Sequence, residues 1–449
     1  MSGMSLDAGI AWLEDHIDYG SWAARSGRTG DVELSLDRMR RVVAELGEPQ
    51  ASQPIIHVTG TNGKGSTSRM VTRLLIAEGL RVGTYSSPHL ALYNERFRVD
   101  DSDVDDNTLA ELLTRVRDVE QALDDRLMPF EILTAAAYLL FAERDVDVAV
   151  IEVGVLGRYD ATNVADGRVA VITNIGFDHT SGEGDWQMRI AMEKAGIIKP
   201  GAHLVLGPVD DRFVDGFRAE NPAAIWRWGE EISVTADVAT KHGRKLSVIT
   251  PWQQLNDLEL PLHGAHQTTN CALAITAASA FLGRALNPDR VPRGLAAVCM
   301  PARLESIHVA DGARPTVILD GAHNPDAARA LAMALAEIPR HGRRVLVVGV
   351  LSGRDPSSML EALGAGTFDQ IITCTPPTGR ARPAREMAEA AESRGWQATA
   401  IDDIGDALHS VIATAGHDDQ IVVTGSIYLV ADARRWLTSE RRWPDAAVT

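Results

Sequence analysis

Cysteine is scarce in this chain. Three cysteines, Cys271, Cys299 and Cys374, are scattered through 449 residues. An odd number of widely spaced cysteines indicates neither a disulfide framework nor a zinc site. Long apolar runs are absent as well, because the longest, 132–142 and 271–283, fall short of the roughly 18 residues that span a bilayer. The sequence thus excludes a small disulfide-stapled module and predicts no transmembrane helix.

Positive charge is also in deficit. Acidic residues outnumber basic residues 61 to 44, which gives a formal net charge of -17. An acidic surface repels nucleic acid and anionic membranes, so we expect neither as a partner. The start of the chain carries Asp7, Glu14 and Asp15 without a basic n-region. We therefore predict no signal peptide and a cytoplasmic location.

The rest of the composition is that of a globular protein with more than one domain. Hydrophobic residues make up 45% and charged residues 23% of the chain, which is ordinary for a folded soluble protein. A chain of this length is expected to form two or three domains. Strands and helices alternate along it, a pattern typical of a parallel sheet with right-handed crossovers. The first predicted strands are 54–59, 81–85, 146–151 and 169–173, and the first predicted helices are 66–78, 108–123, 130–142, 186–198 and 267–282.

The strand–helix pattern begins again after Pro301. We therefore predict an α/β fold in two parts, similar to a Rossmann arrangement in the second. The first part, 1–299, is predicted to be a parallel-sheet nucleotide-binding domain of the phosphate-loop type, interrupted by a β-rich stretch at about 226–262. The second, 300–449, is predicted to be a smaller α/β domain. Its predicted strands are 316–319, 345–348, 370–374 and 420–423, and its predicted helices are 326–336, 357–363, 384–394 and 426–437.

The most informative segment is 57–67, which reads HVTGTNGKGST. Glycines let backbone N–H groups surround phosphate oxygens, the N-terminus of the following helix adds positive potential, and Lys64 adds a charge. The alternative is a glycine-rich β–α turn without a ligand. The strict phosphate-loop pattern is not met, because Val58 and Gly65 depart from it. We predict that phosphate groups contact Gly60, Thr61, Asn62, Gly63, Lys64, Gly65, Ser66 and Thr67; the family resemblance described below implies that these phosphates belong to ATP.

Two further polar residues follow apolar strands. Glu152 follows VAVI, and His179 follows VAVITNIGF. In a parallel sheet these strand ends face the same crevice as the phosphate loop. A carboxylate, an imidazole and a hydroxyl suit Mg²⁺ or Mn²⁺ better than a soft metal. A histidine held by a hydrogen bond within its own loop is the simpler alternative for His179.

Taken in order, the motifs of this chain resemble those of one family. TGTNGKGST is similar to the nucleotide loop of the Mur ligase superfamily, and the additional Gly65 is the form found in folylpolyglutamate synthase/dihydrofolate synthase. The matches run in the family's order from about residue 36 to 430, so they cover nearly the whole chain. The other matching segments are SSPHL (86–90), NERFRVD (94–100), EVGVLGRYDATN (152–163), NIGFDHT (174–180), EKAGIIKPG (193–201), HQTTN (266–270), DGAHNP (320–325) and TGSIYLV (424–430).

The resemblance implies a metal site and a modified lysine. In the family, the residues that match Ser87, Glu152 and His179 bind Mg²⁺, and we expect two ions. The lysine that matches Lys194 is carbamylated by CO₂ in that family, whereas the ordinary alternative is a solvated helix lysine. Carbamylation needs a neutral amine, which burial favours by lowering the pKa of a lysine.

The resemblance also places residues from the second half of the chain at the nucleotide. Asn270, Arg303 and Asp320 are expected to contact ATP, with the planar fork of Arg303 bridging phosphate oxygens. A surface arginine and a helix N-cap are the structural alternatives for Arg303 and Asp320. His323 is expected near the phosphates or the incoming amino acid.

A pterin site is implied at Phe130 and Glu131. The family has a T-x-F-E stretch that contacts pteroate in this region, and Met128 replaces its threonine here. The alternative for Phe130 is an ordinary core residue at the start of its helix.

Three other departures from the family's motifs leave the metal and phosphate positions intact. Leu156 replaces a glycine of EVGLGGR, Ala302 replaces the glycine of PGR, and 353–355 reads GRD where the family has DKD. These departures leave open which acid is the substrate.

The implied activity is that of an ATP-dependent ligase. A substrate carboxylate attacks the γ-phosphate of ATP, and the amine of L-glutamate then displaces phosphate from the acyl phosphate. Lys64, Lys194 and His323 are the expected catalytic residues, and dihydropteroate, a reduced folate or both are the expected acids. The expected state is a monomer. Two alternatives stay open: a related ligase that adds an amino acid to another carboxylate, and a nucleotide-binding module without catalysis.

Overall fold

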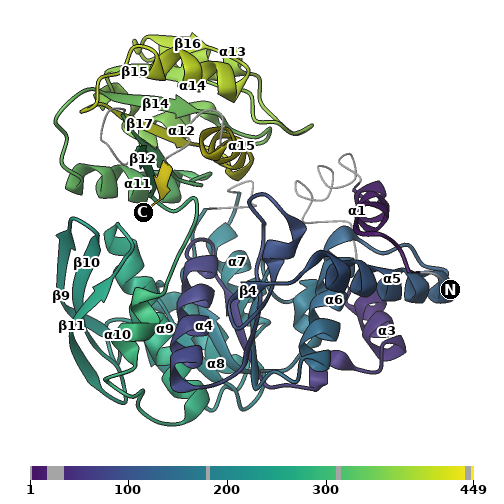
Figure 1. The fold of residues 1–449 in the computed structure, drawn as a ribbon. Coiled ribbons are helices and arrows are strands. Elements are labelled where there is room, and N and C mark those ends of the chain that lie inside the picture. The colour runs from purple at the N-terminus through teal and green to yellow at the C-terminus, as the bar shows by residue number, and fades with distance from the viewer. Residues whose placement is uncertain (1–2, 18–34, 178–182, 310–314, 440–445, 449) are drawn as a thin grey trace. The chain divides into compact units, whose positions relative to one another are not determined.

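The computed structural model describes residues 3–17, 35–177, 183–309, 315–439 and 446–448. Two compact units are distinguished by their internal contacts, each with its own sheet and hydrophobic core (Figure 1). Unit 1 comprises Met1–Asp237, Lys245–Leu260 and Gln267–Val298, and unit 2 comprises Val238–Arg244, Pro261–His266 and Cys299–Thr449.

Unit 1 is built on an eight-stranded sheet with the order β4-β3-β2-β5-β1-β6-β7-β8. From β2 to β8 in this order the strands are parallel, and β3 and β4 form an antiparallel edge. The strand β1, which leads into the glycine-rich loop, lies between β5 and β6. The strands are β1 (Ile55–Thr59), β2 (Val82–Tyr85), β3 (Phe97–Val99), β4 (Ser102–Asp103), β5 (Val148–Glu152), β6 (Gly167–Ile172), β7 (His203–Leu206) and β8 (Ala224–Arg227).

Helices cover this sheet. α4 contacts β1, β2 and β5, while α6 shares an apolar cluster with Ile55 and Ile151, and α7 shares another with Ile172. Every residue of β1 and β5 is buried, because a parallel sheet covered by helices buries both faces of its central strands. The helices are α1 (Leu6–Asp15), α3 (Asp37–Glu45), α4 (Lys64–Glu78), α5 (Asp106–Leu123), α6 (Pro129–Glu143), α7 (Trp186–Ala195) and α8 (Val214–Ala219).

A second, three-stranded sheet with the order β11-β10-β9 follows β8. Its strands are β9 (Ser233–Thr240), β10 (Gly243–Ile249) and β11 (Gln254–Leu260), in the stretch predicted to be β-rich. α9 (Ala265–Leu282) comes next, and all its residues from Cys271 to Ala280 are buried. α10 (Val291–Ala296) then packs on α4.

Unit 2 contains a seven-stranded sheet with the order β16-β15-β14-β17-β13-β12-β18. The strands from β16 to β13 in this order are parallel, whereas β12 is antiparallel to both β13 and β18. The strands are β12 (Glu305–Val309), β13 (Thr316–Leu319), β14 (Arg344–Val348), β15 (Gln370–Thr373), β16 (Ala398–Ala400), β17 (Gln420–Thr424) and β18 (Ala446–Val448). The helices are α11 (Pro325–Glu337), α12 (Pro356–Ala362), α13 (Ala384–Glu392), α14 (Ile404–Ile412) and α15 (Ile427–Thr438).

The predicted fold class is confirmed: a parallel-sheet α/β unit is followed by a second α/β unit with a mixed sheet. The ends of the predicted elements differ from the observed ends by up to three residues, because caps and hydrogen bonds decide the ends and apolar periodicity does not. The β3–β4 edge and α14 were not predicted. β3 and β4 are too short to carry a periodic signal.

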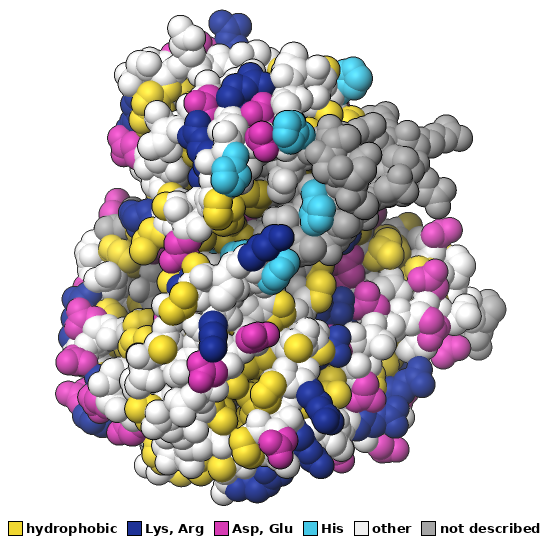
Figure 2. All heavy atoms as spheres, turned by 60° about the vertical axis from the view of Figure 1, so that its left-hand side comes forward, with side chains coloured by type: hydrophobic (Ala, Val, Ile, Leu, Met, Phe, Trp, Pro, Cys, Tyr) yellow, Lys and Arg dark blue, Asp and Glu magenta, His cyan; other side chains and the backbone are white. Residues whose placement is uncertain are grey.

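The described surface mixes both signs of charge. On the face shown in Figure 2, basic side chains lie among acidic ones and do not gather in one basic area. Among the helices of the described residues, none is long and apolar enough to cross a membrane.

Candidate active site

The loop after β1 adopts a conformation that requires glycine at two positions. Gly60 and Gly63 have φ values of 150° and 84°, and Gly63 is the N-cap of α4. A Cβ atom on Gly60 would lie 1.8 Å from Thr173 Oγ1, and one on Gly63 would lie 2.5 Å from Asn270 Oδ1. Backbone conformation and space therefore both exclude a side chain here.

Lys64 is the first residue of α4 and folds back over the loop. Its Nζ donates hydrogen bonds to Gly60 O at 3.0 Å and to Thr61 O at 3.3 Å. The first N–H groups of an α-helix have no partner inside the helix, and they carry the positive end of its dipole. The ammonium and the helix start thus bring positive potential to the same loop, as a phosphate site requires.

Glu152, the last residue of β5, lies beside this loop. Its side chain is buried, and its Oε2 accepts a hydrogen bond from Ser87 N at 3.1 Å. A Cβ atom on Gly65 would lie 3.5 Å from the same oxygen. Gly65, one of the two residues that depart from the strict phosphate-loop pattern, is thus the one that faces the carboxylate.

Asn270, which the resemblance assigns to the nucleotide, reaches the loop from α9. Asn270 Nδ2 donates to Gln267 Oε1 at 3.0 Å, and Gln267 Nε2 lies 3.4 Å from Ser66 Oγ. Both amide side chains are buried. The sequence pattern did not single out Gln267, although it stands in HQTTN one helical turn before Asn270.

Lys194 lies in the last turn of α7 and is only 3% exposed. Gly157 packs directly against this turn: a Cβ atom on Gly157 would lie 2.7 Å from Glu193 O and 3.0 Å from the Cα of Lys194. A solvated helix lysine is therefore the wrong interpretation of Lys194. The predicted metal ligand His179 lies outside the described residues.

Phe130 and Glu131 begin α6. The ring of Phe130 lies against Gly154, where a Cβ atom would approach Phe130 Cζ to 2.5 Å, and Phe130 is partly buried. Glu131 Oε2 accepts hydrogen bonds from Met128 N at 2.7 Å and from Arg38 Nε at 2.8 Å. The carboxylate thus caps its own helix and pairs with α3, while Phe130 is placed beside the strand end of Glu152.

The middle of β1 is connected to the EVGVLGRYDATN segment by a chain of hydrogen bonds. His57 Nε2 lies 2.9 Å from Thr162 Oγ1, and Thr162 Oγ1 donates to Asp160 Oδ1 at 2.5 Å. Burial lowers the pKa of His57 to about 3, so its imidazole is neutral, and burial raises the pKa of Asp160. These groups hold the loop that follows Glu152 against β1.

Unit 2 brings together Asp320, Arg303 and His323. Asp320 is buried at the end of β13, and its carboxylate accepts hydrogen bonds from Leu304 N at 3.0 Å and Ala322 N at 2.9 Å. Burial raises the pKa of Asp320, while the charge of Arg303 opposes that rise. His323 Nδ1 lies 3.0 Å from Gly321 O. The alternative of an N-cap is wrong for Asp320.

Asn324 is the residue that caps the helix. Its side chain accepts a hydrogen bond from Ala327 N at 2.9 Å at the start of α11. Asp320 is therefore free of a capping role and instead joins the turn before β12 to the turn after β13.

Three departures from the family's motifs fall at positions with positive φ. Leu156 and Ala302 have φ values of 63° and 58°, and Gly353 has a φ of 84°. Glycine adopts these values without strain, whereas a residue with a Cβ atom pays a cost of about 1 kcal/mol. Both side chains are accommodated, and Leu156 O accepts a hydrogen bond from Thr59 Oγ1 at 2.6 Å.

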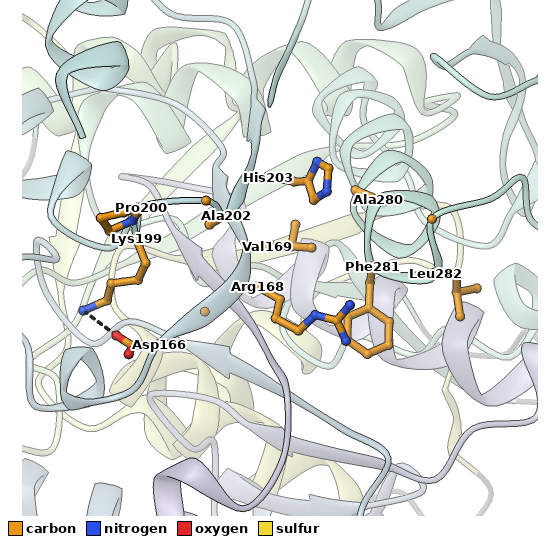
Figure 3. A pocket seen from close by; sticks show the side chains of 13 residues that line it. Asp166, Arg168, Val169, Lys199, Pro200, Ala202, His203, Ala280, Phe281 and Leu282 are labelled. Carbon is orange, nitrogen blue, oxygen red and sulfur yellow. Dashed lines mark ion pairs between the residues drawn. The ribbon is translucent and has the colours of Figure 1, made fainter. Parts of the chain in front are cut away.

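A pocket of about 470 Å³ lies at the amino ends of strands of the unit 1 sheet (Figure 3). It is formed at the amino ends of β6 and β7, whereas the phosphate loop follows the carboxyl end of β1. Its cations already have partners, because Lys199 pairs with Asp166 at 3.6 Å and the guanidinium of Arg168 lies 5.3 Å from the ring centroid of Phe281. This pocket is therefore separate from the candidate site.

Two residues at the loop were not among the predicted site residues. Thr173 and Asn174 follow β6 directly, and both form hydrogen bonds with Asn62. A signal was present in the sequence, since an apolar strand that ends in Thr-Asn beside a phosphate-loop strand places two polar side chains at the same edge.

Fold and loop together define a class of protein. A parallel sheet with a lysine-bearing phosphate loop, followed by a second α/β unit, is the architecture of the Mur ligases. The model of the Mur ligase middle domain matches residues 58–278, and the model of the Mur ligase glutamate ligase domain matches residues 302–427.

Comparison with individual proteins narrows the class. The chain is 34% identical to folylpolyglutamate synthase of Lacticaseibacillus casei, over 92% of this chain and 96% of that protein. It is 36% identical to dihydrofolate synthase/folylpolyglutamate synthase of Mycobacterium tuberculosis, over 90% of each. The chain belongs to the folylpolyglutamate synthase/dihydrofolate synthase family.

Solved structures agree with this assignment. Mycobacterium tuberculosis folylpolyglutamate synthase complexed with ADP superposes with a TM-score of 0.86 at 33% identity, covering 96% of this chain and 99% of that chain. Escherichia coli FolC in complex with DHPP and ADP superposes with a TM-score of 0.83 at 29% identity, covering 96% and 98%.

Proposed function

We propose that this protein is an ATP-dependent ligase that joins L-glutamate to dihydropteroate, to the γ-carboxyl group of reduced folates, or to both. The observation that carries the proposal is the pairing of a lysine-bearing phosphate loop with the buried carboxylate of Glu152 beside Gly65. The names of the relatives, and the ADP and DHPP of the solved neighbours, support the choice of substrates.

The residues around Glu152 fit a magnesium ion. Glu152 and Ser87 supply hard oxygen donors beside the phosphate loop, and Mg²⁺ is commonly held by one or two carboxylates together with substrate phosphates. Glu152, Ser87 and His179 would hold the metal, with two ions in the full site. When bound, Mg²⁺ neutralises charge on the phosphates.

The reaction needs activation of the acid, because joining a carboxylate to an amine in water is uphill. A carboxylate oxygen of the acid attacks the γ-phosphorus, the bond from that phosphorus to the ADP oxygen breaks, and ADP leaves. The glutamate amine then attacks the acyl carbon, loses a proton, and phosphate leaves with the bonding electrons. Lys64 and the N–H groups at the start of α4 stabilise the charge on the transferred phosphoryl group.

Lys194 is proposed to act as a carbamate. Its burial supports this assignment, because a buried ammonium is costly and a neutral amine is the form that reacts with CO₂. The carbamate is an anion that can orient the metal or its ligands. An intact mass higher by one CO₂ in wild type, and lost in Lys194→Ala, is the expected result; an unmodified wild type prepared in bicarbonate would contradict it.

Unit 2 is proposed to supply the remaining contacts. Arg303 and Asp320 are assigned to the nucleotide, and His323 to the phosphates or the incoming glutamate. Their shared cluster around the end of β13 supports a common role. Phe130 is assigned to the pterin, and Glu131 supports the start of its helix. A cytoplasmic monomer completes the proposal.

The test is ADP release by the full chain with Mg²⁺-ATP, L-glutamate and either dihydropteroate or tetrahydrofolate. Turnover is expected to require both the acid and glutamate, and the active acid identifies the substrate. Lys64→Ala is expected to abolish turnover. Lys245→Ala removes an exposed lysine of β10 that pairs with Asp257, and it should retain full activity.

Absence of turnover with either acid in folded protein that binds ATP would overturn the folate assignment. Turnover with a different carboxylic acid in the same assay would then identify a related amino-acid ligase. Equal activity of Lys64→Ala and wild type would contradict the proposed role of Lys64 in stabilising the transferred phosphoryl group.

A further inference from the structure

The side chain of Asn174 occupies the inner side of the phosphate loop. Asn174 Oδ1 accepts hydrogen bonds from Thr61 N at 3.2 Å and from Asn62 N at 3.0 Å, while its Nδ2 donates to Asn62 O at 3.0 Å. One carboxamide thus bonds two N–H groups and one carbonyl of two consecutive loop residues, and the backbone oxygen of Asn174 also accepts from Thr61 N at 3.2 Å.

Thr173 holds the same loop from the preceding position. Its Oγ1 donates to Asn62 O at 2.6 Å, so that carbonyl oxygen accepts from two side chains. The same Oγ1 lies 1.8 Å from where a Cβ atom on Gly60 would be. The end of β6 and the loop are therefore in direct contact over several residues.

These bonds divide the polar groups of the loop into two sets. The N–H groups of Thr61 and Asn62 point to Asn174, and the carbonyl of Asn62 points to Thr173 and Asn174. The N–H groups at the start of α4 have no helical partner and stay available to a ligand. A carbonyl oxygen turned toward a phosphate would repel it, and here that oxygen is held on the side of β6.

We infer that Asn174, supported by Thr173, is the positioning residue of the phosphate loop. Its carboxamide takes the place of a ligand for Thr61 and Asn62, and it thereby directs the phosphates to the N–H groups of the α4 start. A neutral side chain suits this task, because a carboxylate at this position would repel the polyanion. The inference rests on the proposed use of ATP.

The test measures the affinity of the full chain for Mg²⁺-ADP by calorimetry, together with KM for ATP and kcat. Asn174→Ala removes the side-chain hydrogen bonds to Thr61 and Asn62 and leaves Thr61 N only the backbone carbonyl of residue 174, so the dissociation constant is expected to rise about 10-fold or more. KM for ATP should rise more than kcat falls. Thr173→Val should weaken binding less, and Thr173→Ser, which keeps the hydroxyl, should restore it.

Asn163→Ala is the matched control. Asn163 is also buried, and its Nδ2 bridges two carbonyl oxygens, Arg158 O and Gly196 O, both at 2.9 Å. This variant loses a comparable anchor away from the loop, and its affinity for Mg²⁺-ADP should match wild type. An equal loss of affinity in Asn163→Ala and Asn174→Ala would overturn the inference.

A second variant covers the case in which Asn174→Ala does not fold. Asn174→Asp keeps the size and the accepting oxygens, loses the donor to Asn62 O and adds a negative charge, so it should bind Mg²⁺-ADP at least as weakly. Wild-type affinity in this variant would overturn the inference about Asn174 and leave the proposed function standing. Failure of wild type itself to bind Mg²⁺-ATP or Mg²⁺-ADP would instead overturn the proposed function.

Discussion

The phosphate loop of unit 1 and the turn before β12 in unit 2 are held in similar ways. In each, a side chain at the end of a parallel strand accepts hydrogen bonds from two backbone N–H groups: Asn174 from Thr61 and Asn62, and Asp320 from Leu304 and Ala322. The two accepting groups differ in charge, because Asn174 carries a neutral amide and Asp320 a buried carboxylate. The neutral side chain adds no negative charge to the loop that is proposed to hold phosphates.

The phosphate loop and the turn before β12 also differ in the physical reason that restricts which residue each can hold. At Gly60 a Cβ atom would collide with Thr173 as well as strain the backbone, whereas Ala302 already carries a Cβ atom at a φ of 58°. A side chain is excluded where there is no space for it, whereas a strained backbone conformation only lowers the stability by a modest amount. The predictions below follow from that difference.

The largest effect is expected from Gly60→Ala. The added methyl group must displace Thr173, so the loop and its hydrogen bonds to Asn62 are lost, and affinity for Mg²⁺-ADP should fall roughly 100-fold or more. Gly79→Ala is the control, because Gly79 has a φ of 97° with open space around its Cβ position. Calorimetry should show that the control loses stability but keeps its affinity; a similar loss of affinity in both would contradict the role of space.

The pH dependence of the stability should distinguish the carboxylate of Asp320 from the neutral carboxamide of Asn174. Because the pKa of Asp320 is raised in the folded protein, the native state holds its proton at pH values where the unfolded chain has lost it. Stability from this group is present below 3.8, the ordinary value, and is lost as pH rises through the folded pKa. The free energy of unfolding of wild type relative to Asp320→Asn should therefore fall as pH rises through this window.

Urea unfolding of both proteins at a series of pH values measures this difference. Asn174→Ser, which replaces the neutral carboxamide, should show a difference from wild type that does not change with pH. A difference between wild type and Asp320→Asn that grows with pH would contradict the direction of the Asp320 shift.

The smallest effect is expected from Ala302→Gly. Glycine removes the strain of a positive φ, but it adds freedom to the unfolded chain, so the net gain in stability should be about 0.5 kcal/mol. Ala390→Gly, in the middle of α13, should instead lose about 1 kcal/mol. Thermal or urea unfolding measures both, and a loss in Ala302→Gly as large as in the control would show that no strain is stored there.

Much of the candidate site was accessible from the pattern of residues. Lys64 and Glu152 were predicted from their positions after strands, Asn270 was implied by the family resemblance, and the structure brings all three to one loop in unit 1. Thr173 and Asn174 were missed, because short polar residues at a strand end look like any turn until the neighbouring strand is known. The two contacts of Glu131, with the start of its own helix and with Arg38, were also missed, because Arg38 lies far away in the chain.

The amino-acid order determined the alternation of strands and helices, the glycine-rich turn and the class of chemistry, because these depend on local periodicity and on residues a few positions apart. The tertiary structure decided which side chains share the loop. Asn174 reaches Thr61 because β6 pairs with β1, and Asn270 reaches Gly63 because α9 lies against the loop and the start of α4. Contacts of this kind join residues more than a hundred positions apart, and no local pattern records them.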